Sequence, residues 1–334
     1  MREHPQRGGV PLRDDPDPAR RAHETGRHAG GGEGAGHVRD ATTHPRQFRG
    51  GVRVRSAAKP PCCRLFAARW LYCHPGPARA SIPTVSPLHL HSFGDGDPVL
   101  ALHGVTGHGE RWRVLADALP DHRLIGVDLR GHGRSPWAPP WGFEQHVTDL
   151  LAVLDAEGLD RVPVIGHSFG GAIAVHLTRI APERVERLVL LDPAIGLDPQ
   201  DMLETAEDTR ADESYPDLAA ARADRTQRWE GIAADLVDAE LAAHLVPDGD
   251  RWRYRYSRAA VVAAWGEMAR TAITPVGPTL LVPATKADFV APAWVDACRA
   301  ALGDDLTVAP VDSGHMVFLE RTAEVAEHIR AFLR

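Results

Sequence analysis

A serine between two glycines is the residue of this chain best placed to act as a nucleophile. Ser168 stands at the centre of Gly166-His167-Ser168-Phe169-Gly170, with the apolar run 162–165 before it and an Ala-rich segment after it. That order predicts a buried strand, a sharp turn that lifts the serine out of the sheet, and then a helix. Because serine is a poor nucleophile at neutral pH, it also needs a base and a carboxylate that orients the base.

Two later residues have the right types and the right order to supply those groups. Asp288 follows the apolar run 279–284, and His315 follows the run 306–311. Both runs are predicted as strands, so both side chains are expected on loops beyond the carboxyl ends of strands, in the chain order serine, acid, histidine. We therefore predict a triad of Ser168, Asp288 and His315, in which His315 takes the serine proton and Asp288 holds the imidazole.

The elements around these residues alternate between strand and helix patterns. Helical spacing at 112–119 and 143–157 separates short apolar runs that we interpret as strands, at 88–93, 99–102, 124–127, 162–165 and 187–191. Strands that alternate with helices in this way predict an α/β fold, with a parallel sheet covered by helices on both faces.

The segment from about 193 to 275 breaks this alternation. It is helical in composition, acidic near its start, and carries no convincing strand. We predict a helical insertion, after which the core pattern resumes with the strand 279–284, the helix 291–302, the strand 306–311 and the closing helix 322–333.

From about residue 85 to the end, the chain resembles the α/β-hydrolase-fold serine hydrolases. The motifs that carry the resemblance are His103-Gly104 after a strand, the Asp128–Ser135 segment, Gly-His-Ser-Phe-Gly-Gly, Leu191-Asp192-Pro193, and Gly314-His315 before the last helix. The resemblance implies a mostly parallel sheet, a helical cap at about 193–275, and an oxyanion hole made by the backbone N–H groups of Val105 and Phe169. It also makes Asp192 the rival of Asp288, because some relatives carry the acid after the sixth strand.

The triad and the resemblance together imply hydrolysis of a carboxylic ester of a small molecule through an acyl-serine intermediate, without metal or organic cofactor. Three alternatives remain open: a hydrolase of carbon–carbon bonds, a cofactor-free haloperoxidase or perhydrolase, and a non-catalytic ligand receptor on the same fold. His108 and Trp137 are candidates to line the substrate pocket.

The first 84 residues differ from the rest of the chain. Residues 1–80 carry 15 Arg and Lys against 7 Asp and Glu, whereas the remainder carries 23 against 38. The segment is rich in Gly, Pro, Arg and His and has no sustained periodicity, so we predict a disordered extension. We interpret it as the product of a misplaced start, with the working protein beginning near Val85. A basic arm that binds nucleic acid is the alternative, but the segment has no motif for it.

Cysteine usage and charge limit the compartment and the partners. Cys62, Cys63, Cys73 and His74 superficially suggest a metal cluster, but adjacent cysteines are poor zinc spacing. With Cys298 as the fourth cysteine, no disulfide framework is implied, which favours the reducing cytoplasm. The acidic hydrolase region and the lack of a long apolar run predict neither nucleic-acid nor membrane binding, and the oligomeric state stays open.

Overall fold

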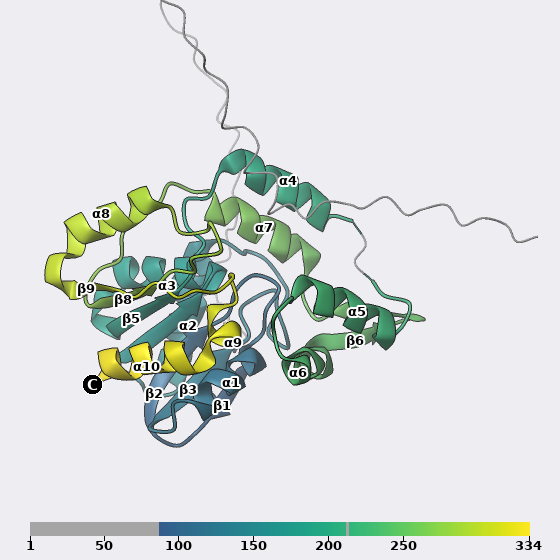
Figure 1. Cartoon of the computed structure of the whole chain (residues 1–334), viewed down its shortest axis with the longest axis horizontal. Coiled ribbons are helices and arrows are strands. Elements are labelled where there is room, and N and C mark those ends of the chain that lie inside the picture. Colours follow the sequence, from purple (N-terminus) through teal and green to yellow (C-terminus); the bar gives the residue numbers. More distant parts are fainter. Residues whose placement is uncertain (1–86, 212–213) are drawn as a thin grey trace, which may run out of the picture. The chain divides into compact units, whose positions relative to one another are not determined.

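The computed structural model describes residues 87–211 and 214–334 (Figure 1). The disordered extension predicted for residues 1–84 lies outside the described residues, as do Cys62, Cys63, Cys73 and His74. No helix among the described residues is both long and apolar enough to cross a membrane.

A seven-stranded sheet forms the centre of the described chain, in the spatial order β1-β3-β2-β4-β5-β8-β9. Its strands are β1 (Leu90–Phe93), β2 (Asp97–Leu102), β3 (His122–Val127), β4 (Val162–His167), β5 (Val185–Leu191), β8 (Thr279–Val282) and β9 (Leu306–Val308). Strand β1 runs antiparallel to β3, and all other neighbours are parallel. The mostly parallel sheet predicted from the sequence is therefore confirmed.

Helices cover both faces of this sheet (Figure 1). They are α1 (Arg113–Asp117), α2 (Phe143–Ala156), α3 (Phe169–Ile180), α8 (Pro292–Leu302), α9 (Val317–Glu320) and α10 (Thr322–Leu333). Successive side chains of a strand point to opposite faces, and both faces are apolar here. In β4, Val164 packs into the cluster that holds Leu150 of α2, whereas Ile165 packs into the cluster that holds Ile329 of α10.

The chain between β5 and β8 forms the cap, the name we keep for residues 193–275. It contains the helices α4 (Pro199–Thr209), α5 (Leu218–Arg228), α6 (Ala234–His244) and α7 (Arg258–Met268). Helices α4 and α7 pack against each other, and α5 and α6 lie beside the core (Figure 1).

The helical cap also contains two short strands, where the sequence shows no convincing one. Strands β6 (Leu245–Asp248) and β7 (Arg251–Tyr254) form an antiparallel hairpin around Gly249, which has a positive φ of 64°. Two strands of four residues are marginal alone. Here Tyr215 extends the pairing through two backbone hydrogen bonds with Trp252, of 2.7 and 2.8 Å, so contacts from distant sequence stabilise the hairpin.

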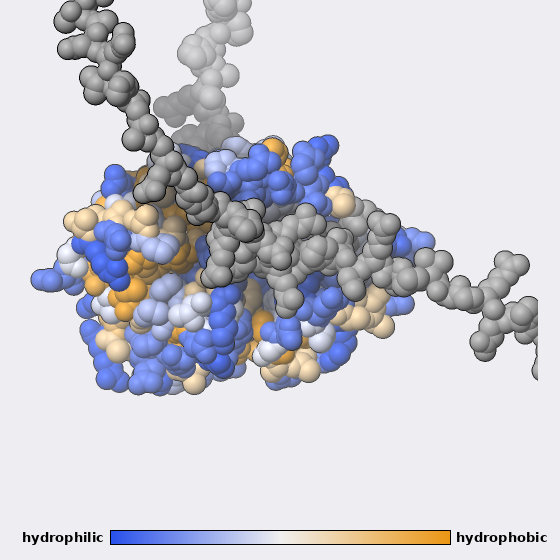
Figure 2. All heavy atoms as spheres, turned by 45° about the horizontal axis from the view of Figure 1, so that its top comes forward, coloured by the Kyte–Doolittle hydropathy of each residue, from blue (hydrophilic) through white to orange (hydrophobic). Residues whose placement is uncertain are grey.

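The surface is mostly hydrophilic in the view of Figure 2, with apolar patches between charged side chains. The large apolar residues that are exposed lie on separate elements and are Ile180, Leu203, Leu218 and Val276. Scattered apolar residues of this kind are normal on a folded protein and do not by themselves mark a binding surface.

Candidate active site

Ser168 lies in a strained turn between β4 and α3, as the sequence predicted. Its backbone has φ 53° and ψ −121°, a conformation that costs a non-glycine residue about 1–3 kcal/mol. Neighbouring backbone holds it there, since the Ser168 N–H donates to the Leu191 carbonyl at the end of β5, 3.2 Å away. Close packing fixes the turn as well, because a Cβ at Gly170 would overlap the carbonyl oxygen of Leu102.

His315 lies in the loop between β9 and α9, and its partner is Asp192. The distance from His315 Nδ1 to Asp192 Oδ2 is 2.6 Å. Asp192 directly follows β5, is fully buried, and has a positive φ of 42°. Its other oxygen accepts the backbone N–H of Ala284 at 3.0 Å. A buried carboxylate held in this way can fix the tautomer and the orientation of the imidazole.

The structure corrects the predicted partner of His315. Asp288 is exposed, and among the described residues it makes no hydrogen bond to His315. The next residue, Phe289, contacts the imidazole instead, with ring centroids 3.9 Å apart and nearly parallel planes. The physical reason is sheet order: β5 lies next to β4, whereas β8 is one strand further out. The rival carboxylate, Asp192, is therefore the one that contacts His315.

A second histidine joins the His315 loop to β4, the strand that directly precedes Ser168. His167 Nε2 lies 2.9 Å from the carbonyl oxygen of His315, so this nitrogen carries the proton and donates it. Burial, together with the neighbouring His315, lowers the pKa of His167 well below its ordinary value, which keeps the ring neutral. The residue before Ser168 thus holds the loop that carries the imidazole.

The loop after β2 lies against the serine from the other side. A Cβ placed on Gly104 would be 3.0 Å from Ser168 Cβ, so a side chain there would crowd the serine. His103 accepts the Leu129 N–H through Nε2 at 3.0 Å, and its Nδ1–H therefore donates to the Gly104 carbonyl at 2.7 Å. Within the described part of the chain, the N–H groups of Val105 and Phe169 have no hydrogen-bond partner. Two such amides beside a serine hydroxyl could receive a developing oxyanion.

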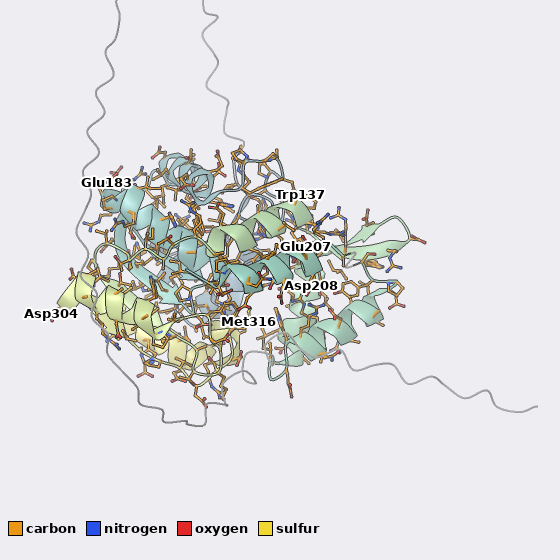
Figure 3. The ribbon with its side chains drawn as sticks, turned by 90° about the horizontal axis from the view of Figure 1, so that it is seen from above. Trp137, Glu183, Glu207, Asp208, Asp304 and Met316 are labelled. Carbon is orange, nitrogen blue, oxygen red and sulfur yellow. The ribbon has the colours of Figure 1, made fainter. Side chains whose placement is uncertain are left out.

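The two residues predicted to line a substrate pocket lie in different surroundings. His108 is buried and its Nε2 lies 2.9 Å from Glu240 Oε2 of α6. Trp137 is half-buried, with the Arg253 guanidinium 5.1 Å from its ring centroid. In the view from above, Trp137 and Met316, the residue after His315, lie on opposite sides of the α4–α7 pair (Figure 3). Their place in a pocket stays a prediction.

One group of side chains among the described residues has metal-ligand character. His89, His91 and Asp128 each offer an atom within 4.8 Å of the others. Asp128 already accepts the N–H groups of Gly109 at 2.7 Å and Arg134 at 2.8 Å, and it contacts His91 at 3.1 Å. Although burial opposes it, contact with Asp128 and Glu110 raises the pKa of His91. His91 and Asp128 thus already belong to an ion-paired network that supports the turn after β3.

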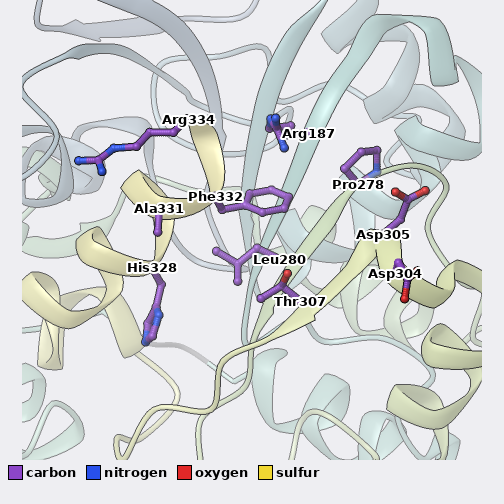
Figure 4. A pocket seen from close by; sticks show the side chains of 10 residues that line it. All are labelled: Arg187, Pro278, Leu280, Asp304, Asp305, Thr307, His328, Ala331, Phe332 and Arg334. Atoms are coloured by element: carbon purple, nitrogen blue, oxygen red, sulfur yellow. The ribbon is translucent and has the colours of Figure 1, made fainter.

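An open hollow of about 450 Å³ lies away from these residues, at the amino-terminal ends of β8 and β9 (Figure 4). Arg187, Leu280, Asp305, Thr307 and Phe332 are among the residues that line it. Ligands of open α/β sheets bind beyond the carboxyl ends of the strands, where Ser168, Asp192 and His315 lie. The hollow therefore belongs to the opposite end of the sheet from the candidate site.

The fold and the arrangement at Ser168 define a class of protein. A model of the alpha/beta hydrolase fold family matches residues 97–322, and the chain belongs to that family. It is an enzyme of the α/β-hydrolase class, as the sequence predicted.

Individual relatives agree with this assignment. The chain is 43% identical over 255 residues to Lipase LipV of Mycobacterium tuberculosis (strain ATCC 25618 / H37Rv). This match covers 74% of this chain and 97% of the relative. The chain is 27% identical over 250 residues to Esterase YbfF of Escherichia coli (strain K12), covering 71% and 92%. Among solved structures, E-2-(Acetamidomethylene)succinate Hydrolase matches with a TM-score of 0.65 and 23% identity, covering 74% of this chain and 94% of that one. That likeness concerns the fold alone.

Proposed function

We propose that the protein hydrolyses a carboxylic ester of a small molecule through an acyl-serine intermediate. The observation that carries the proposal is the contact of 2.6 Å between His315 Nδ1 and Asp192, beside a serine in the strained elbow conformation. Because Nδ1–H donates to the carboxylate, Nε2 is the free nitrogen that can take a proton from Ser168. The names of the relatives, a lipase and an esterase, support an ester as the substrate.

In the proposed reaction each group has a separate task. His315 takes the Ser168 proton as the serine oxygen attacks the ester carbonyl, and Asp192 stabilises the imidazolium that forms. The N–H groups of Val105 and Phe169 receive the oxyanion, and the proton passes from His315 to the departing alcohol. His315 then activates a water molecule, which releases the acid and restores the serine. The chain's own residues thus account for every proton in the cycle.

The test is the Ser168→Ala variant with p-nitrophenyl butyrate as substrate. We expect turnover to fall by about 10⁴-fold or more, because the attacking group of the acylation step is removed. Labelling of the wild type by a fluorophosphonate probe should also vanish in the variant. A variant that retained wild-type turnover would rule out the acyl-serine mechanism.

Further assays separate the alternatives. Turnover of a vinylogous 1,5-diketone in preference to esters would indicate a carbon–carbon bond hydrolase, and acetate-dependent peroxide chemistry would indicate a perhydrolase. A folded wild type that the fluorophosphonate did not label would favour a ligand receptor. A screen over acyl length and alcohol size then defines the substrate. The cytoplasmic location stays a prediction.

A further inference from the structure

One residue of the cap makes a buried ionic contact with the segment that follows the candidate oxyanion loop. Glu240 of α6 accepts two hydrogen bonds from Arg111, 2.5 Å from Nη2 to Oε1 and 3.0 Å from Nε to Oε2. Its Oε2 also lies 2.9 Å from His108 Nε2. We call Glu240, Arg111 and His108 the Glu240 cluster. Glu240 has 2% of its side-chain surface exposed, so this contact is shielded from water.

Glu240 is ionised in this buried place. Burial favours the neutral acid, but the Arg111 guanidinium and His108 hold the pKa of Glu240 well below its usual range. A buried carboxylate that keeps its charge requires its partners in fixed positions, because an unpaired charge in the interior is costly. The bidentate geometry of the Arg111–Glu240 contact fixes the orientation of the two groups as well as attracting them. The cluster is thus a rigid link between α6 and its partners.

The two partners of Glu240, His108 and Arg111, follow closely on the turn that contains Val105. The Gly107 N–H donates to the Gly104 carbonyl at 3.0 Å, which closes a turn with Val105 and Thr106 at its centre. Thr106 has a positive φ of 61°, so the turn is strained as well as tight. The Arg111 Nη1 atom lies 3.0 Å from where a Cβ of Gly107 would be. The guanidinium therefore packs directly on the end of the turn.

His108 receives a second contact from the same helix. His244 stands one helical turn after Glu240 and stacks on the His108 ring, with centroids 4.5 Å apart and planes 20° apart. From the core side, His103 holds the Gly104 carbonyl at the beginning of the turn. The Val105 turn is thus fixed at one end by the core and at the other by the cap.

From this geometry we infer that Glu240 is a positioning residue for the oxyanion hole. Through Arg111 and His108 it holds the turn that contains Val105, the proposed oxyanion donor, so the cap contributes to the rate. The inference rests on the proposed function, since it needs an oxyanion to form at Ser168. An oxyanion donor acts only when it is preset at the correct place, and a displacement of about 1 Å can cost about 100-fold in rate.

The experiment compares Glu240→Gln with a matched variant, Glu267→Gln, in the full chain. Glu267 lies on the cap helix α7 and also makes a polar contact to the core, accepting the Phe143 N–H at 2.8 Å, but it does not touch the Val105 turn. Active sites are first counted by complete fluorophosphonate labelling. The readouts are kcat per labelled site, KM for p-nitrophenyl butyrate, and Ki for an aliphatic trifluoromethyl ketone, which forms a tetrahedral adduct with serine.

For Glu240→Gln we expect kcat per labelled site to fall about 10- to 100-fold and Ki of the ketone to rise by the same factor, with KM within twofold of wild type. Glu267→Gln should leave all three within twofold. A Glu240→Gln enzyme with wild-type kcat per site and wild-type Ki overturns the inference, whatever happens to its melting temperature. A rise in KM alone also overturns it, because that pattern indicates a substrate contact.

A second variant keeps the test decisive if Glu240→Gln does not fold. Arg111→Lys retains the positive charge beside Glu240 but loses the bidentate contact. We therefore expect a smaller fall in kcat per labelled site and a smaller rise in Ki, again with little change in KM. A failure of the proposed function can be distinguished from a failure of the positioning role. A wild type without ester turnover, or an active Ser168→Ala variant, contradicts the mechanism, whereas an active wild type with an unchanged Glu240→Gln contradicts only the positioning role.

Discussion

The central strands bury almost only apolar side chains, whereas the cap buries charged side chains beside apolar ones. The central strands bury aliphatic residues such as Val164 and Leu190, with no exposed surface. The buried residues of the cap include Arg225, Glu240 and His244, each less than 10% exposed. Aliphatic residues tolerate exchange for others of similar volume, whereas buried charges require particular partners. The sheet is therefore specified largely by its apolar pattern, whereas the cap also depends on buried polar pairs that no periodicity reveals.

The largest expected effect tests which core carboxylate, Asp192 or Asp288, serves His315. Asp192→Asn should lower kcat/KM for p-nitrophenyl butyrate by about 10⁴-fold, because the amide no longer stabilises the charged imidazole or fixes its tautomer. Asp288→Asn, on the exposed loop before Phe289, should stay within twofold. The reverse order of the two variants would restore Asp288 as the acid and contradict the role of the contact seen at His315.

A Gly→Ala substitution should have opposite effects on stability in the core and in the cap. In α3 of the core, Gly170→Ala should destabilise by about 2 kcal/mol or more, because the new methyl group meets the Leu102 carbonyl. In α7 of the cap, Gly266 is exposed and has nothing within 4 Å of the added methyl. There, Gly266→Ala should stabilise by about 1 kcal/mol through helix propensity. Urea unfolding of both variants measures the difference, and a shift of the same sign in both would break the comparison.

Acid should weaken the core through its buried histidines. Burial, with the charges of His132 and Arg130 nearby, lowers the pKa of His146 to about 3. Because this pKa lies below the unfolded value near 6.5, the unfolded chain binds the proton first as the pH falls, and stability is lost between about pH 7 and pH 3. His146 alone should cost about 2 kcal/mol between pH 7 and pH 5. Urea unfolding at both pH values tests this.

The control for the pH effect is His146→Phe, which removes the titrating group from the packing against Phe169. Between pH 7 and pH 5, we expect the free energy of unfolding of the wild type to fall by about 2 kcal/mol more than that of the variant. An equal loss in both proteins would show that other groups cause the acid effect.

Much of the fold could be predicted because the core follows simple periodicities. The closing helix was expected at 322–333 and is found at Thr322–Leu333, and the strand–turn–helix around Ser168 has the expected form. The β6–β7 hairpin escaped prediction because Tyr215, thirty residues and more away in the chain, completes its pairing. Short strands with such distant partners leave no local signal.

The candidate site could be predicted in part. Ser168 and His315 were proposed from motif and order, but the choice between Asp192 and Asp288 depends on which strand lies beside β4. Both aspartates follow predicted strands, so chain order alone does not distinguish them. The Glu240 cluster was missed for a similar reason: Glu240 is a single acid on a cap helix, far along the chain from His108.

The neighbouring positions of β5 and β8 have a consequence for how the protein folds. Leu191 pairs with Val282 across these strands, although the whole cap lies between them in the chain. Closing so long a loop costs entropy before any contact repays it, so we expect this pairing to form late. Strands β1 to β5 are joined by much shorter connections and can assemble earlier. We therefore expect the turn that carries Ser168 to form before the imidazole of His315 joins it.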